Sequence, residues 1–282
     1  MKHNLFITLL LIILFLLAHI IGFYIIKHYL PQSQSLPLGI EKLQLDEQTS
    51  YIPIFITLLI ATILALVLVK FKALRLWKLW YFLSVFMTLL IGFGAFTKEI
   101  IALVLAIALA LLKIFKPNVV IHNLTEVFMY GGLAAIFVPV LNIFSITILL
   151  ILISIYDMVA VWKTKHMVSM AKFQTESKLF AGLMIGYNEN KSSKKVVNKS
   201  KNIKLESGRQ AILGGGDIAF SLMFSGVVLK TFGFIPALIT SLAAALALLF
   251  LFFIAEKKKF YPAMPFITVG VLIGYAIVIL TL

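Results

Sequence analysis

Runs of apolar residues, separated by shorter polar stretches, divide the whole 282-residue chain. A helix needs about 20 residues to cross roughly 30 Å of hydrocarbon, and about 17 is the usual lower limit. The runs therefore predict nine transmembrane helices, of which the fourth and fifth are the shortest. They cover residues 5–26, 52–69, 80–96, 100–115, 124–138, 143–162, 211–229, 233–255 and 263–282.

One long polar interval, residues 163–209, interrupts this pattern. Residues 188–207 have the composition of a mobile linker. The apolar patch at 179–187 is too short to cross a membrane and is expected to lie at the interface or to cover a site. We therefore expect three regions: helices one to six in residues 1–162, a cytoplasmic, basic and partly flexible loop in 163–209, and helices seven to nine in 210–282.

Composition strengthens the membrane interpretation. Hydrophobic residues make up 62% of the chain, whereas the apolar share of a soluble domain is about 45–50%. The predicted fold class is an all-α, multi-pass membrane protein. The sequence contains no cysteine, which excludes disulfides, a thiolate nucleophile and thiolate metal sites.

The net charge of +14 comes from 25 Lys and Arg residues against 11 Asp and Glu residues. In a soluble protein this imbalance would suggest nucleic acid, but basic residues also accumulate in cytoplasmic loops of membrane proteins. No nucleic-acid-binding motif of the usual kinds is present. In the nine-helix arrangement, 21 of the 25 basic residues lie on the side of the amino terminus. The amino terminus is therefore predicted to be cytoplasmic and the carboxyl terminus outside.

The sixth and seventh predicted helices each carry an acidic residue, Asp157 and Asp217. A charged side chain at the bilayer centre costs about 2.5–3.5 kcal/mol on insertion scales. The presence of both acids within predicted helices therefore needs an explanation. Asp157 precedes Lys163 by six residues and Asp217 follows Arg209 by eight. These spacings place the acids about 9 and 12 Å from the cytoplasmic border. Because consecutive helices run antiparallel, the two carboxyls can face each other.

Two carboxyls held close together in a low dielectric share one proton and titrate as a unit. The ionised carboxyl can activate a water molecule that attacks a peptide carbonyl, and the protonated one can donate to the carbonyl oxygen. The same residues are also compatible with another function, that of a proton- or cation-coupled transporter or channel that uses the two acids as coupling sites. The absence of an internal sequence repeat and the matched depth of the acids favour the enzyme.

Two further motifs lie at the starts of predicted helices. The glycine run 214–216 directly precedes Asp217. Glycines let a substrate backbone approach closely, but they also permit tight helix packing. The segment 262–265, Pro-Ala-Met-Pro, opens the last helix. It is either an ordinary helix boundary or a rigid turn that contacts an extended peptide.

Three motifs follow one another along the chain: Tyr156-Asp157 in the sixth predicted helix, Gly214-Gly215-Gly216-Asp217 in the seventh, and Pro262-Ala263-Met264 at the start of the ninth. Together they resemble the presenilin and signal peptide peptidase family, whose pattern is a Tyr-Asp pair, a Gly-x-Gly-Asp and a Pro-Ala-Leu, carried on nine transmembrane helices. Met264 stands where Leu is usual, a change that roughly conserves volume.

The resemblance implies a presenilin-like fold and an intramembrane aspartyl endopeptidase, a hydrolase without cofactor or metal, that cuts transmembrane segments of other proteins. Asp157 and Asp217 would be the catalytic acids. Tyr156, the glycine run 214–216 and the segment 262–264 would shape the site and seat the substrate.

The resemblance also bears on topology and partners. Presenilin-type members keep the amino terminus cytoplasmic and signal peptide peptidases are inverted, so the charge count favours substrates with an outside amino terminus. The short chain resembles stand-alone microbial, particularly archaeal, members, so accessory subunits are not expected to be required. The sequence is compatible with a homo-oligomer. We expect an integral protein of the cell membrane whose partners are lipid and transmembrane substrates, not nucleic acid.

Other sites have weaker support. A prepilin-type peptidase also carries a Gly-x-Gly-Asp, but it does not account for the Tyr-Asp and Pro-Ala-Met motifs. The sequence has no His-Glu-x-x-His metal motif and no Gly-x-Ser-x-Gly nucleophile motif. His122 and Glu126 are expected at the start of the fifth helix, where the helix dipole stabilises an acid. His19 is expected to be packed or hydrogen-bonded within the first helix.

Overall fold

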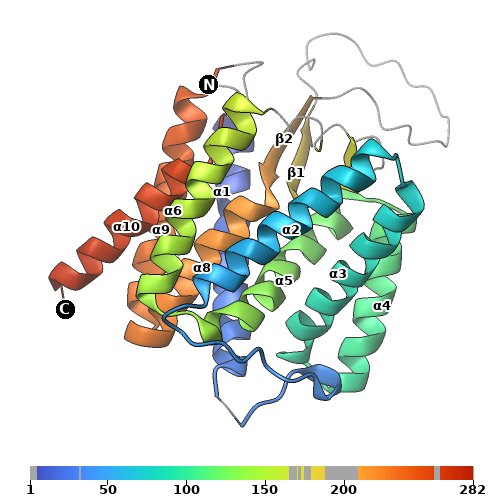
Figure 1. Ribbon diagram of the computed structural model, residues 1–282, viewed down its shortest axis with the longest axis horizontal. Helices are drawn as coiled ribbons and strands as arrows, with labels where there is room; N and C mark the ends of the chain where they lie inside the picture. The colour runs from blue at the N-terminus through green and yellow to red at the C-terminus, as the bar shows by residue number, and fades with distance from the viewer. Residues whose placement is uncertain are drawn as a thin grey trace.

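The computed structural model describes residues 5–31, 33–164, 170, 173–174, 179–187, 209–256 and 261–281. This part of the chain forms nine long helices and one two-stranded antiparallel sheet (Figure 1). The helices are α1 (Leu5–Tyr29), α2 (Tyr51–Lys70), α3 (Leu74–Gly94), α4 (Glu99–Phe115), α5 (Val119–Phe137), α6 (Ile143–Met158), α8 (Gly215–Phe232), α9 (Phe234–Ile254) and α10 (Met264–Thr281). The shorter elements are the 3-10 turns η1 (Pro37–Gly39) and η2 (Val138–Val140), the π-helical turn η3 (Val159–Lys163), and the strands β1 (Gly182–Tyr187) and β2 (Arg209–Gly214).

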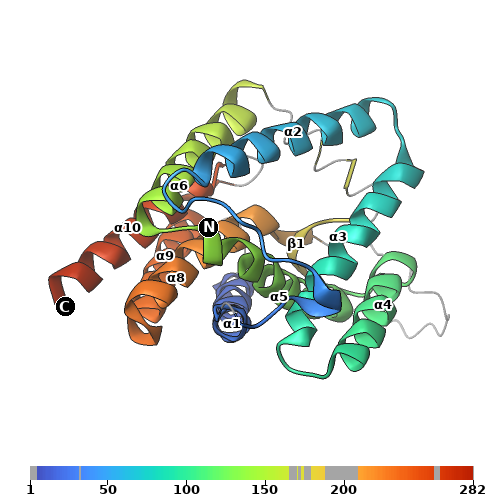
Figure 2. The ribbon, with the colours of Figure 1, turned by 60° about the horizontal axis from the view of Figure 1, so that its bottom comes forward.

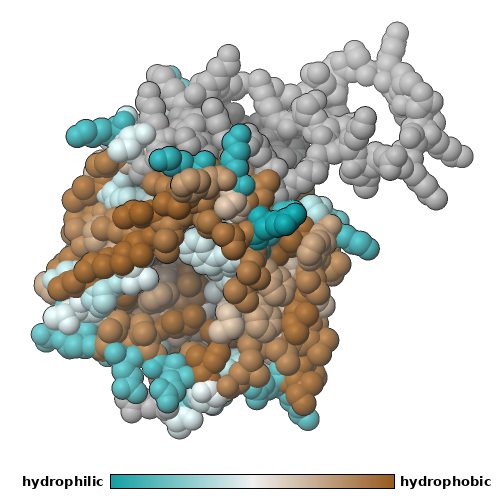
Figure 3. Space-filling model, turned by 45° about the vertical axis from the view of Figure 1, so that its right-hand side comes forward, coloured by the Kyte–Doolittle hydropathy of each residue, from teal (hydrophilic) through white to brown (hydrophobic). Residues whose placement is uncertain are grey.

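The helices have the length and composition of membrane-spanning segments. Eight of the nine described helices are long and apolar enough to cross a membrane. The remaining one, α4, has 17 residues, which is about the lower limit for a span. Figure 3 shows an apolar belt on the face in view, with hydrophilic residues gathered toward its upper and lower ends. A belt of exposed apolar side chains is expected where a protein contacts the hydrocarbon of a bilayer.

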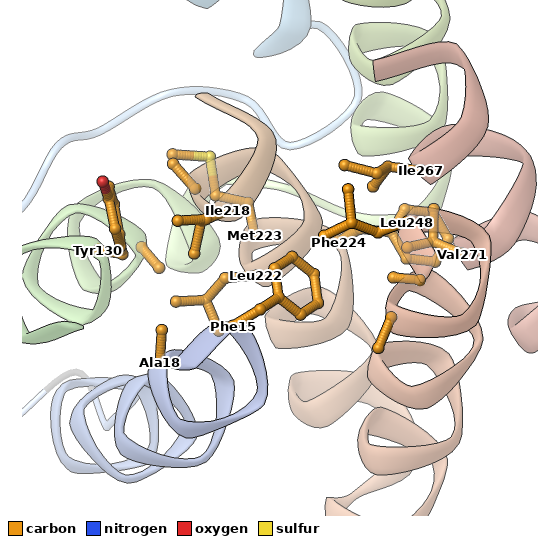
Figure 4. Close-up of a cluster of buried hydrophobic side chains, with 14 of the residues drawn as sticks. Phe15, Ala18, Tyr130, Ile218, Leu222, Met223, Phe224, Leu248, Ile267 and Val271 are labelled. Carbon is orange, nitrogen blue, oxygen red and sulfur yellow. The ribbon is translucent and has the colours of Figure 1, made fainter. Parts of the chain in front are cut away.

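Helix α8 lies inside the bundle and contacts α1, α5, α6, α9 and α10. Figures 1 and 2 place α3 and α4 on one side of it, α9 and α10 on the other, and α2 across the bundle. A helix that is apolar on all sides is expected in such a central place. Figure 4 shows the core around Leu222 and Phe224 of α8. The other helices contribute Phe15 and Ala18 of α1, Leu248 of α9, and Ile267 and Val271 of α10.

The close approach of α1 to α8 depends on a glycine. A Cβ atom added to Gly22 would lie 2.5 Å from Cδ2 of Leu222. Small residues at such crossings let helix backbones pack closely in a membrane. One turn earlier in α1, His19 is buried and its Nδ1 lies 2.9 Å from the Phe15 carbonyl oxygen. This is the packed, hydrogen-bonded state that we expected for this histidine.

The two-stranded sheet was not predicted. Residues 211–214, expected to begin the seventh helix, belong to β2, and the apolar patch 179–187 contains β1. Apolar runs of about four to eight residues fit a strand as well as the end of a helix, so periodicity does not separate the two. The fold is therefore mostly helical with one small sheet, rather than all-α.

Helix α5 begins at Val119, five residues before the predicted start. Asn118 caps it, since the Asn118 side chain accepts a hydrogen bond of 2.9 Å from the Val120 N–H. Glu126 consequently lies two turns inside the helix and is fully buried. The expected stabilisation by the helix dipole was wrong, because that effect is confined to the first turn. Glu126 instead forms an ion pair with Lys113, a residue in the last turn of α4 that the charge count had placed on the cytoplasmic side.

Candidate active site

Helices α6 and α8 bring Asp157 and Asp217 to the same part of the bundle. Asp157 is the penultimate residue of α6 and is 7% exposed. Asp217 is the third residue of α8 and is half-buried. The two helices contact each other. The two acids that the sequence placed at one depth therefore lie on neighbouring helices.

The start of α10 binds Asp157. The Met264 N–H donates to Oδ2 of Asp157 at 3.2 Å. The Ala263 carbonyl accepts from the Ile267 N–H at 3.1 Å, so α10 begins at this point. Amides in the first turn of a helix have no acceptor within the helix, which leaves the Met264 N–H available. The Pro-Ala-Met segment is thus an ordinary helix start and also the contact to an intramembrane acid.

A second contact joins α6 and α10 one turn away. The hydroxyls of Ser154 and Thr268 lie 2.7 Å apart and both residues are buried. Sequence analysis did not single out either residue, because an isolated Ser or Thr in an apolar helix is common. This contact and the Met264 amide together hold the start of α10 against the end of α6.

Helix α6 changes geometry immediately after Asp157. From Val159 to Lys163 the chain forms a π-helical turn, and the Val159 N–H is shared between the carbonyls of Ile155 and Tyr156. Such wider turns occur frequently at functional sites. Tyr156 is half-buried on the last α-helical turn, directly beside Asp157.

The three glycines before Asp217 have different surroundings. A Cβ on Gly214 would lie 3.1 Å from Oδ2 of Asp217, and one on Gly215 would lie 2.8 Å from the Tyr130 hydroxyl. A Cβ on Gly216 would have only the Phe220 ring near it, at 3.9 Å. Gly215 is therefore needed for packing against Tyr130, a Cβ on Gly214 would press on the Asp217 carboxyl, and Gly216 has room for a Cβ.

An apolar groove of about 710 Å³ lies between α2, α3, α5 and α8. Its lining includes Phe220 and Met223, roughly one and two turns beyond Asp217 on α8. Trp77 and Trp80 of α3 line another part of it. The groove thus connects a surface of the bundle with the helix that carries Asp217.

The arrangement is suited to acid–base chemistry on water. Two carboxyls lie on contacting helices, and one of them accepts a backbone N–H. Such a pair can take up and release one proton between its members. Among the described residues, no group of three or more His, Asp or Glu side chains could hold a metal ion.

Comparisons with known proteins show the family and the fold of this chain. A family model described as "Signal-peptide peptidase, presenilin aspartyl protease" matches residues 21–282. A solved structure of a presenilin family intramembrane aspartate protease in space group C222 is similar with a TM-score of 0.70 and 19% identity. The similarity covers 98% of this chain and 99% of that one. A second, in space group P2, is similar with a TM-score of 0.67 and 18% identity over 96% and 97% of the two chains.

A search of curated protein sequences found no match. At these identities the structural likeness shows a shared fold, while the family match extends over nearly the whole chain. The chain belongs to the signal-peptide peptidase and presenilin family of intramembrane aspartyl proteases.

Proposed function

We propose that this protein is an intramembrane aspartyl endopeptidase in which Asp157 and Asp217 activate water and hydrolyse peptide bonds within transmembrane segments of other proteins. What supports the proposal is that these two acids lie on contacting helices, α6 and α8, in a chain of this family. Two carboxyls inside a membrane bundle are costly to keep. A pair of carboxyls that activates water would explain why both acids are present.

In the proposed reaction one carboxyl of the pair is ionised and the other is protonated. The ionised carboxyl takes a proton from water as the water oxygen bonds to the peptide carbonyl carbon, and the protonated carboxyl gives its proton to the carbonyl oxygen. The tetrahedral intermediate then carries two hydroxyls. One carboxyl protonates the amide nitrogen as the C–N bond breaks, and a hydroxyl proton returns to the other. The products are a carboxylic acid and an amine.

Substrate would approach through the apolar groove and react in an extended form. A helical segment fits an apolar groove, but its peptide bonds are shielded by their own hydrogen bonds. β2 pairs with β1 alone in the described part of the chain and runs directly into the turn that carries Asp217. An unwound peptide could pair with the outer edge of β2. Gly216 has room for a neighbouring group in the turn that carries Asp217, and the start of α10 at Met264 contacts Asp157.

The charge asymmetry supports a cytoplasmic amino terminus and an outside carboxyl terminus. In Figure 1 the start of α1 and the two strands lie toward one end of the bundle, and the end of α10 toward the other. We propose that residues 1–162 and 210–282 form the transmembrane parts and that residues 163–209 form a cytoplasmic loop. Substrates then have outside amino termini and the protein lies in the cell membrane. It acts without accessory subunits, as a single chain or as a homo-oligomer.

The test is cleavage of a single-span peptide by the purified protein in lipid vesicles. We expect one principal cut within the span, inhibition by a transition-state analogue with a hydroxyl at the scissile position, and loss of activity in Asp157→Asn and in Asp217→Asn. The loss should be at least about 100-fold for each, the usual contribution of an acid–base group. Asp46→Asn, the same chemical change at an exposed loop residue, should leave the rate unchanged.

Normal cleavage by either acid variant would show that the pair is not the catalyst. Ion flux through the vesicles without any cleavage would favour a transporter that uses the same acids.

A further inference from the structure

The outer edge of β1 is hydrogen-bonded to side chains of α5. Asn123 uses both ends of its amide: Nδ2 donates to the Met184 carbonyl at 2.8 Å, and Oδ1 accepts from the Met184 N–H at 3.0 Å. His122 Nε2 lies 2.7 Å from the Gly182 carbonyl oxygen, and the Gly182 N–H donates to Glu126 at 3.1 Å. Alternate residues of a strand direct their backbone groups to the same side. These four contacts therefore stand where a third strand would pair with β1.

Glu126 is the centre of this cluster and is fully buried. It also accepts hydrogen bonds from the Lys113 ammonium of α4 and from the Tyr130 hydroxyl. Lys113 is 3% exposed. A buried ion pair adds little net stability compared with apolar packing, and ionisable residues within membrane-spanning helices usually mark function. The proposed reaction uses neither residue, so their retention needs another explanation.

Strand β1 determines where the turn before Asp217 lies. Gly182 is paired with Gly214 at the end of the sheet. Just beyond this pair, the Gly215 N–H donates to the Ala181 carbonyl at 3.2 Å. Asp217 follows two residues later. A shift of β1 along β2 would thus move the start of α8.

Tyr130 provides a second connection from α5 to the same turn. Its hydroxyl donates to Glu126, and it lies so close to Gly215 that an added Cβ would be 2.8 Å from the hydroxyl oxygen. Position 215 therefore has no room for a larger side chain in this protein. The side chain of Glu126 contacts β1 through Gly182 and the glycine run through Tyr130.

We propose that His122, Asn123 and Glu126 are positioning residues that close the β1 edge of the sheet and hold β2, and with it Asp217, in one register. This inference rests on the proposed function. Because the β1 edge is occupied, an extended substrate can join the sheet only at β2. The choice of the peptide bond that is cut then depends on α5, a helix that contributes no catalytic acid.

The experiment compares Asn123→Ala with wild type in the vesicle cleavage assay. The variant removes both amide contacts to Met184 and leaves both acids in place. We expect kcat to fall by about tenfold, the effect of losing one to two hydrogen bonds from a positioned site, with a smaller change in KM. Mass spectrometry of the products should show cuts at neighbouring peptide bonds. Asn123→Gln, which keeps an amide, should recover part of kcat.

Asn142→Ala is the matched control for simple destabilisation. Asn142 caps α6, where its side chain accepts from the Ser145 N–H at 2.8 Å. Its replacement should lower the thermal stability without changing which bond is cut. A loss of rate in Asn123→Ala that merely follows its loss of stability, with the cut bond unchanged, would show a structural role only and overturn the inference.

Amide hydrogen exchange gives a readout that does not depend on activity. Exchange at Gly182 and Met184 should be faster in Asn123→Ala than in wild type. Unchanged exchange overturns the inference. Absence of cleavage by wild type, or cleavage that survives Asp217→Asn, overturns the proposed function, and the exchange comparison then still decides whether Asn123 holds the sheet.

Discussion

Replacing Lys113 with methionine removes one half of the buried ion pair between α4 and α5 and keeps the length of the side chain. The Glu126 carboxylate then keeps two neutral donors, the Tyr130 hydroxyl and, at 3.1 Å, the Gly182 N–H. Removal of one partner from a buried pair costs about 3–5 kcal/mol. Because two donors remain, we expect a loss in the free energy of unfolding at the lower end, about 3 kcal/mol.

The reverse replacement, Glu126→Leu, should cost more. It leaves the Lys113 ammonium with only neutral partners, the Thr125 hydroxyl at 3.1 Å and the Met129 sulfur at 3.4 Å. It also removes the acceptor of two buried donors, each of which costs about 1–3 kcal/mol when unsatisfied. We expect a loss of about 5 kcal/mol or more. The double variant contains no buried charge at this place and should be more stable than Glu126→Leu alone.

Unfolding in mixed micelles with increasing SDS measures these differences, and the four proteins form a double-mutant cycle. Glu47→Gln is the control. Glu47 pairs with Lys230 at 2.7 Å, but the two side chains are 47% and 26% exposed, and such pairs contribute about 0–1 kcal/mol. A Lys113→Met variant as stable as wild type, or strict additivity in the double variant, would refute the reasoning.

Two further predictions concern the proposed site. Met264→Pro removes the N–H that binds Asp157 at a helix start that tolerates proline, so kcat should fall about tenfold. Thermal stability should fall as well, because the Met264 side chain is buried in the core, whereas Met264→Leu should behave as wild type in both respects. Gly215→Ala should lower thermal stability because its Cβ would meet the Tyr130 hydroxyl at 2.8 Å, whereas Gly216→Ala should fold normally and raise KM. Equal stability of the two alanine variants would contradict the packing difference.

Much of the bundle could be predicted because every helix that crosses the hydrocarbon must be apolar over about 20 residues. Each of the nine apolar runs overlaps one described helix. The depth of Asp157 and Asp217 along consecutive predicted helices led us to expect that they would come together, and the two helices that carry them contact each other. Their catalytic role stays a prediction.

Contacts between distant elements could not be predicted in the same way. The Met264 amide reaches Asp157 only because α10 packs on α6, and no local pattern states which helices are neighbours. β1 is bound by α5 side chains about sixty residues earlier in the chain, such as Asn123. Lys113 was counted only as a charge on the cytoplasmic side, because its partner, Glu126, lies on the next helix. The Asn118 cap was a local signal that could have moved the start of α5.

The contact between Met264 and Asp157 has a consequence for biosynthesis. Helix α10 follows every other described helix in the chain, so the ribosome makes it after them. Until α10 has been inserted, Asp157 lacks the backbone donor that holds it. The nascent protein therefore passes through the insertion machinery, surrounded by the transmembrane segments of other proteins, before its own site is complete.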